Sequence, residues 1–174
     1  MSIITGSWFE FRHHNAKEGK YWNDACTRFN GGNWDEKIKE ISNAGLDTLV
    51  LMAVALDGKA FYKSSICPLY DSGCTEPLED LLRATDKYGM DVFVGNGFWE
   101  NWATPEPCIN DQSIRIWTDA FKELEKYSSS FNSFKGWYWP TEAHINPYFT
   151  EKYMDYVSIM SAIARKMTPG KKIL

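Results

Sequence analysis

The chain has 174 residues, of which 44% are hydrophobic and 24% charged, so it can bury the core of one domain. Its formal net charge is −4, from 19 basic and 23 acidic residues without long runs of either sign, which argues against a nucleic-acid partner. No apolar stretch reaches the roughly 18 residues of a membrane span. The aromatic content of 16%, with eight tryptophans, suits stacking against sugar rings as well as core packing.

Short apolar segments alternate with amphipathic ones along the whole chain. The predicted strands are Ile3–Phe11, Thr48–Leu56, Met90–Asn96, Gly136–Trp139 and Lys172–Leu174. Between them, apolar residues spaced three or four apart predict four helices, marked by Trp34–Ile41, Leu78–Thr85, Ile114–Leu124 and Tyr153–Ala164. Asn33, with Glu36 three residues later, is the expected cap of the first helix, and Thr150 that of the fourth.

This alternation predicts an α/β fold with a parallel sheet, either doubly wound or closed into a barrel. No Gly-x-Gly-x-x-Gly follows the first strand, which disfavours a dinucleotide-binding fold. Long segments after strands and short ones before them favour a (β/α)₈ TIM barrel. Eight units take at least about 200 residues, so we predict one partial barrel domain over residues 1–174, with the first four to five units. A missing C-terminal half or a second chain then completes the barrel; an open α/β sheet is the alternative.

The four cysteines, Cys26, Cys67, Cys74 and Cys108, fall in predicted segments between strands and helices. An even number in such segments is compatible with disulfides in an oxidising compartment, and Cys67 with Cys74 is the easiest pair to close. Four unpaired thiols are the alternative. The absence of a Cys-x-x-Cys pattern argues against a zinc site.

Several motifs, in the same order along the chain, resemble one uncharacterised bacterial family of glycosidase-type TIM barrels, the domain-of-unknown-function family forty-four thirty-four. The motifs are Gly6–Phe11, His13–Asn15, Gly45–Leu51, Gly95–Phe98 and Gly136–Glu142. The resemblance implies a glycoside hydrolase-like fold, a carbohydrate ligand and an extracytoplasmic location, with no activity assigned. It covers essentially the whole chain, which is shorter than a complete barrel and looks like its N-terminal half.

Glu142 is the first candidate for catalysis. In the retaining glycosidases that the chain resembles, the acid/base glutamate follows strand four, and Glu142 follows the fourth predicted strand. Glycoside cleavage needs a second carboxyl group, about 5–5.5 Å away for retention or about 6.5–9.5 Å for inversion. The resemblance implies a nucleophile after strand seven, beyond this chain. Residues two apart share a strand face, so Tyr138 and Glu142 are expected to face the barrel interior, and Trp137 and Trp139 the helices.

Glu10 ends the first predicted strand and is the candidate partner carboxylate, with a structural salt bridge as the alternative. The remaining candidates for substrate binding lie at predicted strand ends or just beyond them: Trp8, His13, His14, Asp57, Asn96, Trp99, Glu100, Trp102, Tyr138 and His144. No His-Glu-x-x-His spacing or Gly-x-Ser-x-Gly occurs, so we predict neither a metal nor a cofactor nor a serine nucleophile. The predicted function is a glycoside hydrolase; a non-catalytic carbohydrate-binding barrel and a fragment without independent function are the alternatives.

Overall fold

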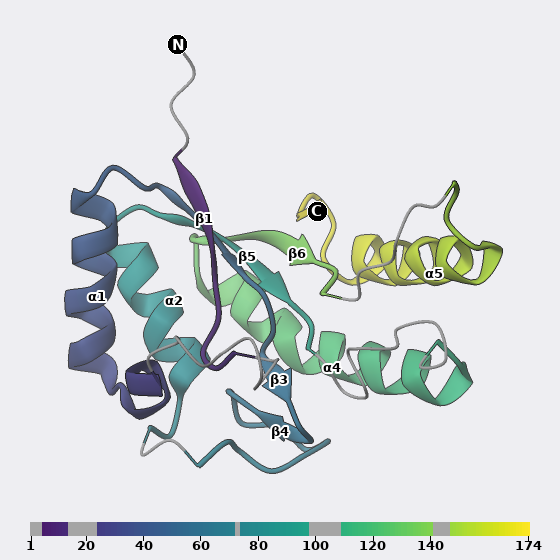
Figure 1. Cartoon of the computed structure of the whole chain (residues 1–174), viewed down its shortest axis with the longest axis horizontal. Coiled ribbons are helices and arrows are strands. Elements are labelled where there is room, and N and C mark those ends of the chain that lie inside the picture. The colour runs from purple at the N-terminus through teal and green to yellow at the C-terminus, as the bar shows by residue number, and fades with distance from the viewer. Residues whose placement is uncertain (1–4, 14–23, 72–73, 98–108, 141–146) are drawn as a thin grey trace.

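Five parallel strands form the main sheet, in the order β1-β2-β5-β6-β7 (Figure 1). The structure is a computed structural model that describes residues 5–13, 24–71, 74–97, 109–140 and 147–174. The strands are β1 (Gly6–Phe9), β2 (Thr48–Leu51), β3 (Ala55–Leu56), β4 (Lys59–Ala60), β5 (Asp91–Gly95), β6 (Phe134–Tyr138) and β7 (Lys172–Ile173). The helices are η2 (Asp24–Arg28), a 3₁₀ helix, and α1 (Gly31–Asn43), α2 (Pro77–Lys87), α4 (Asp111–Ser130) and α5 (Glu151–Met167).

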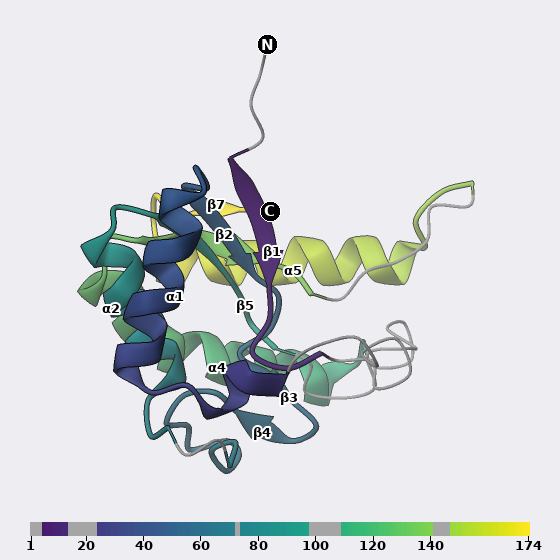
Figure 2. The ribbon, with the colours of Figure 1, turned by 60° about the vertical axis from the view of Figure 1, so that its left-hand side comes forward.

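The strand order decides between the two predicted architectures. Each strand of the sheet pairs with the next one along the chain, whereas a doubly wound sheet reverses its strand order at a switch point. The four described α-helices also pack on the same face of the sheet, because their buried residues form a single core cluster with Leu51, Val94 and Trp137 of the strands. Figures 1 and 2 show α1 beside α2, and α4 beside α5. This is the arrangement of successive β/α units in a barrel.

The opposite face of the sheet carries a second, smaller apolar cluster. Val50, Phe93 and Tyr138, from three neighbouring strands, make up this cluster, and Met52 packs against it. These residues alternate with the ones that face the helices, as the period of two in a strand requires. We call this side the inner face of the sheet, because it corresponds to the interior of a closed barrel.

Two glycines let strands approach their neighbours closely on this sheet. A Cβ at Gly95 would lie 1.8 Å from the carbonyl oxygen of Met52, and one at Gly136 would lie 2.2 Å from that of Lys172. Both distances are far inside van der Waals contact, so these two positions accept only glycine unless the backbone shifts.

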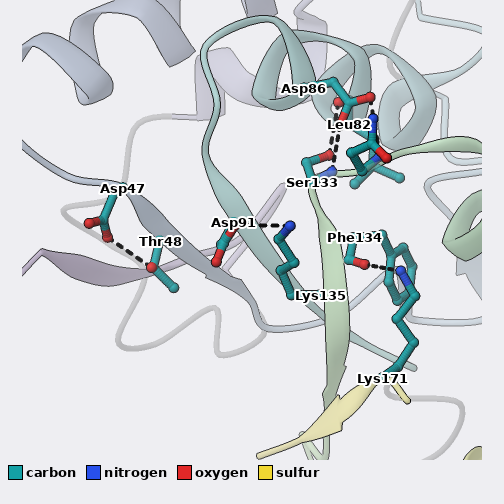
Figure 3. Close-up of polar contacts among 10 residues, drawn as sticks. Asp47, Thr48, Leu82, Asp86, Asp91, Ser133, Phe134, Lys135 and Lys171 are labelled. Carbon is teal, nitrogen blue, oxygen red and sulfur yellow. Dashed lines mark hydrogen bonds and ion pairs between the residues drawn. The ribbon is translucent and has the colours of Figure 1, made fainter. Parts of the chain in front are cut away.

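The amino-terminal edge of the sheet is held by polar contacts (Figure 3). The Asp86 carboxylate at the end of α2 accepts hydrogen bonds from the backbone N–H groups of Asn132 and Ser133, where β6 begins. The Lys171 ammonium donates to the carbonyl of Phe134, and Lys135 pairs with Asp91 at 3.5 Å. The first contact joins the end of α2 to the start of β6, and the other two join β6 to β5 and to the connection before β7, on the side where barrels place stability rather than catalysis.

The structure corrects two predicted boundaries. Thr48–Leu56 is not one strand, because β2 ends at Leu51 and β3 begins only at Ala55. Between them, the N–H of Val54 donates to the carbonyl of Gly95 at the end of β5. The cap of α1 is Asn30 rather than Asn33. The Asn30 Oδ1 accepts from the N–H groups of Gly32 and Asn33, and the Asn33 side chain accepts in return from the N–H of Asn30. Thr150 caps α5 as predicted.

Candidate functional site at the carboxyl edge of the sheet

The connections that follow strands are much longer than those that precede them. Residues 10–30, 52–76, 96–110 and 139–150 separate a strand of the main sheet from the next described α-helix, whereas residues 44–47, 88–90, 131–133 and 168–171 lead from an α-helix into a strand. The long connections therefore gather at the carboxyl edge of the sheet. In barrels of this kind the functional residues come from that edge.

Three of the predicted residues, Trp8, Glu10 and His13, lie in or just after β1. Trp8 lies on the inner face, where its ring meets that of Tyr138 edge to face at 6.5 Å, and it remains 62% exposed. Glu10 follows the strand, and its Oε1 lies 3.8 Å from Nδ1 of His13. Both side chains are mostly shielded, at 18% and 22% exposed. The structure thus places His13 beside Glu10 and leaves the Trp8 ring open on the inner face.

Asp57 lies at the tip of a hairpin that the sequence analysis missed. The hairpin joins β3 to β4, and both central residues of its turn, Asp57 and Gly58, have positive φ angles of 52° and 70°. An Asp-Gly pair with positive φ at both positions is the signature of a type I′ turn. The Asp57 carboxylate pairs with Arg12 at 3.5 Å, and the Arg12 guanidinium lies over the ring of Tyr70. Asp57 is therefore placed by a turn rather than by a strand end.

Asn96 is buried, with 2% of its surface exposed, just after β5. Its Nδ2 donates to the carbonyl of Trp117 in α4, at 3.1 Å. This bond ties the end of the strand to the helix that follows it, so Asn96 has a structural role at the edge of the sheet.

Residues of β6 confirm the predicted alternation of faces. Tyr138 packs against Val50 and Phe93 on the inner face. Trp137 and Trp139 face the helices, where both rings meet Phe121 of α4 edge to face, at 4.5 and 5.5 Å. The indole N–H of Trp137 donates to the Thr168 hydroxyl at 2.8 Å. The packing of these two large rings against α4 thus fixes the carboxyl end of β6.

Six of the predicted site residues lie outside the described part of the chain. They are His14, Trp99, Glu100, Trp102, Glu142 and His144. Their roles stay predictions from the sequence.

A contact that no sequence motif indicates holds the long connection after β2. The Glu123 carboxylate of α4 accepts hydrogen bonds from the hydroxyls of Ser64 and Ser65, both at 2.6 Å, and from the N–H of Ser65 at 2.7 Å. Burial alone would raise the pKa of Glu123, but these hydrogen bonds outweigh it and hold the pKa below its usual value. The partners are nearly 60 residues apart in the sequence, so no local pattern could have linked them.

Cys67 and Cys74, the pair expected to close most easily if disulfides form, are not joined to each other, because Cys67 is a free thiol, as is Cys26. The Cys74 thiol donates to the Asp80 carboxylate at 3.3 Å, which directs it toward the start of α2. Burial raises the pKa of Cys67, and the nearby Glu123 carboxylate raises it further, so this thiol stays protonated at neutral pH. Cys108 lies outside the described residues.

Within the described ranges, no group of three or more His, Cys, Asp or Glu side chains could hold a metal ion. None of the helices in those ranges is long and apolar enough to cross a membrane.

Solved structures similar to this one are glycoside hydrolases or related proteins. A protein from Bacteroides thetaiotaomicron VPI-5482, provisionally assigned as an α-L-fucosidase, matches 98% of this chain with a TM-score of 0.75 and 20% identity, over 50% of its own length. A family 39 glycoside hydrolase from Bacteroides cellulosilyticus WH2 matches 97% of the chain, with a TM-score of 0.59 and 12% identity, over 30% of its length. The GH5_18 protein of Streptomyces cattleya, in complex with GlcNAc, matches 98%, with a TM-score of 0.59 and 14% identity, over 44% of its length.

These likenesses define the class: the chain has the glycosidase-type TIM-barrel fold, in the form of a partial barrel. It spans half or less of the length of the structures it matches. The chain belongs to the family described as "Domain of unknown function (DUF4434)", whose model matches residues 4–174. No curated protein matches it by sequence.

Proposed function

We propose that this domain cleaves glycosidic bonds in poly- or oligosaccharides, with Glu142 as the general acid/base. The observation that carries the proposal is the placement of β6 as the fourth strand of a glycosidase-type sheet, with Tyr138 on the inner face. In the sequence, Glu142 follows Tyr138 by four residues, and β6 ends at the edge where glycosidases of this fold keep their chemistry.

The end of β1 supplies a second part of the proposed site. Trp8 offers an exposed aromatic ring on the inner face, suited to the apolar face of a sugar. Glu10 is the described candidate for the partner carboxylate, and its Oε1 lies 3.8 Å from Nδ1 of His13. In this arrangement Glu10 binds sugar hydroxyls or assists the acid, and a further carboxylate from the rest of the barrel completes the pair that cleavage needs.

Glu142→Gln tests the proposal. The amide keeps the size of the side chain but cannot donate a proton as an acid, so hydrolysis should fall by roughly 100-fold or more. Release of reducing sugar from a panel of fucosylated, N-acetylglucosamine-containing and glucose-based oligosaccharides measures this. Glu125→Gln, on the exposed side of α4, is the matched control and should leave the rate unchanged.

Two results would contradict the proposal. In the first, no member of the panel is cleaved by the wild-type chain or by its full-length parent. In the second, Glu142→Gln cleaves at the wild-type rate. If sugars bind without being cleaved, the domain is a carbohydrate-binding barrel, and Trp8→Ala should then weaken binding while Glu142→Gln does not.

An extracytoplasmic location is part of the same proposal, and it rests on the family to which the chain belongs. Cell fractionation of the native host with an antibody against the domain tests it. Recovery only in the cytoplasmic fraction would contradict it.

A further inference from the structure

Two cationic side chains share one tyrosine ring at the carboxyl edge of the sheet. The Arg12 guanidinium lies 5.5 Å and the Lys59 ammonium 5.8 Å from the centre of the Tyr70 ring. Phe61 stacks on the same ring at 4.8 Å, with 26° between the planes, and so covers one of its faces. Both cations therefore lie toward the opposite face, where the ring attracts positive charge. We call Arg12, Lys59 and Tyr70 the cation platform.

The cation platform is anchored to the core by stacked rings. Phe61, which is buried, stacks in turn on the buried ring of Phe11 at 4.8 Å. The N–H of Tyr70 donates to the carbonyl of Ala60 in β4 at 2.7 Å, which fixes the backbone beside the hairpin. Three rings thus lead from the core to the half-exposed Tyr70. Groups on such a rigid support lose little conformational entropy when a ligand covers them.

The platform joins the connections that follow two neighbouring strands. Arg12 comes after β1, and Lys59 lies in the hairpin after β2, the strand that pairs with β1. Figures 1 and 2 both show the β3–β4 hairpin at the end of the molecule toward which β1 runs. Arg12 follows Glu10 by two residues, so their Cα atoms lie within about 7 Å of each other. A ligand at Glu10 is therefore within reach of Arg12.

The platform carries more positive than negative charge. Arg12 pairs with Asp57 at 3.5 Å, and both side chains are well exposed, at 40% and 62%. Among the described residues, no carboxylate lies at ion-pairing distance from the Lys59 ammonium. One positive charge is thus left over at this edge, in a chain whose formal net charge is −4.

A structural role explains only part of this arrangement. The pair between Arg12 and Asp57 ties the two connections together, which accounts for Arg12. A lysine on a short exposed strand also discourages pairing with other chains. That role does not require the Lys59 ammonium to lie beside a ring that already holds a guanidinium.

We propose that the cation platform binds the negatively charged group of an acidic sugar, a carboxylate or a sulfate ester. This inference rests on the proposed function, and it names the class of substrate, an anionic glycan rather than a neutral one. Lys59 supplies the unpaired charge, and the planar guanidinium of Arg12 matches two oxygens of such a group. Because the platform is exposed, its effect on affinity is modest and falls as salt is added.

Calorimetric titration with matched pairs of oligosaccharides tests the inference, on the chain or its full-length parent. Each neutral sugar is compared with an anionic counterpart: glucose-based with glucuronate-containing, fucosylated with fucose-sulfated, and N-acetylglucosamine oligomers with their 6-sulfated forms. In the pair that the site recognises, the anionic member should bind roughly three- to tenfold more tightly at low salt. The difference should shrink at about 0.5 M sodium chloride, which screens exposed charges.

Charge substitutions on the platform should move this preference in opposite directions. Lys59→Gln should weaken binding of the anionic member roughly two- to fivefold, whereas Lys59→Arg should keep it. Asp57→Asn frees Arg12 from its carboxylate and should tighten binding by a similar factor, and asparagine tolerates the positive φ of this turn position. Affinity for the neutral member should stay the same. Lys166→Gln, at an exposed residue near the end of α5, is the control. Urea unfolding of each variant verifies that the fold is kept.

The outcomes separate this inference from the proposed function. Equal binding of neutral and anionic members, in a protein that binds or cleaves glycans, overturns the acidic-sugar inference alone. A preference for anionic sugars that is undiminished in Lys59→Gln also overturns it, because the charge then comes from elsewhere. A preference confined to uronates or to sulfated sugars supports the inference and identifies the group that is bound. Failure to bind or cleave any of the probes overturns both proposals.

Discussion

Neighbouring residues at the end of β1 have opposite environments. Trp8 faces the inner side of the sheet and is 62% exposed, whereas Phe11 is 1% exposed and packs its ring against Phe61 at 4.8 Å. Both are aromatic and lie three positions apart, so composition alone could not separate a ligand-binding ring from a core ring. Alternation of faces is the signal that distinguishes them, because positions three apart in the predicted strand Ile3–Phe11 point to opposite faces.

Alanine substitutions at these two positions should have opposite effects. Trp8→Ala removes a ring that is mostly in water, so the free energy of unfolding should change by less than about 1 kcal/mol. Sugar binding should weaken at the same time. Phe11→Ala leaves a cavity beside Phe61 and should cost about 3–5 kcal/mol. Urea denaturation measures the stabilities, and calorimetry with N-acetylglucosamine tetramer measures binding. A stability loss for Trp8→Ala as large as that for Phe11→Ala would contradict the exposed placement of Trp8.

Among the elements, the connection after β2 departs most from the sequence prediction. Apolar residues continue from β2 to Leu56, and this run predicted one long strand. The residues are buried, but they build a hairpin and a loop that extend the core beyond the sheet edge. The Asp57-Gly58 pair was the available signal for this turn. The hydrogen bonds from Ser64 and Ser65 to Glu123, which we call the Glu123 clamp, could not be predicted, because they depend on how α4 packs in three dimensions.

This clamp predicts a pH-dependent contribution to stability. The pKa of Glu123 is lowered in the folded state, so its contribution is fully present above the unfolded pKa of about 4.5 and is lost as the pH falls through the folded value. Glu123→Gln cannot accept the same three hydrogen bonds and should be less stable than the wild type by about 1–3 kcal/mol at pH 7. The difference should shrink below about pH 4. Urea unfolding from pH 3 to 7 measures it, with Glu125→Gln as the control. A difference that is constant over this range would contradict the clamp.

At the scale of the whole molecule, most of the fold followed from the sequence. The structure has the predicted alternation of strands and helices and the predicted long segments after strands. It also has Tyr138 on the opposite face of the sheet from Trp137 and Trp139, as predicted. These features are periodic and local, so a single sequence carries them. Less of the candidate site could be predicted from the sequence, because it depends on side chains from several connections that meet only after folding. Half of the twelve predicted site residues, including Glu142, lie outside the described ranges.

We propose that a carbohydrate binds at the carboxyl edge of this sheet, with Glu142 beside the bond to be cleaved. The most direct measurement is a crystal structure of the Glu142→Gln variant, in the chain or its full-length parent, soaked with an oligosaccharide from the panel. We expect a sugar against Trp8, with the side chain of residue 142 within about 3 Å of a glycosidic oxygen. A carboxylate should lie within about 5–9.5 Å of that side chain. A sugar bound elsewhere, or residue 142 turned away from a sugar bound at this edge, would contradict it.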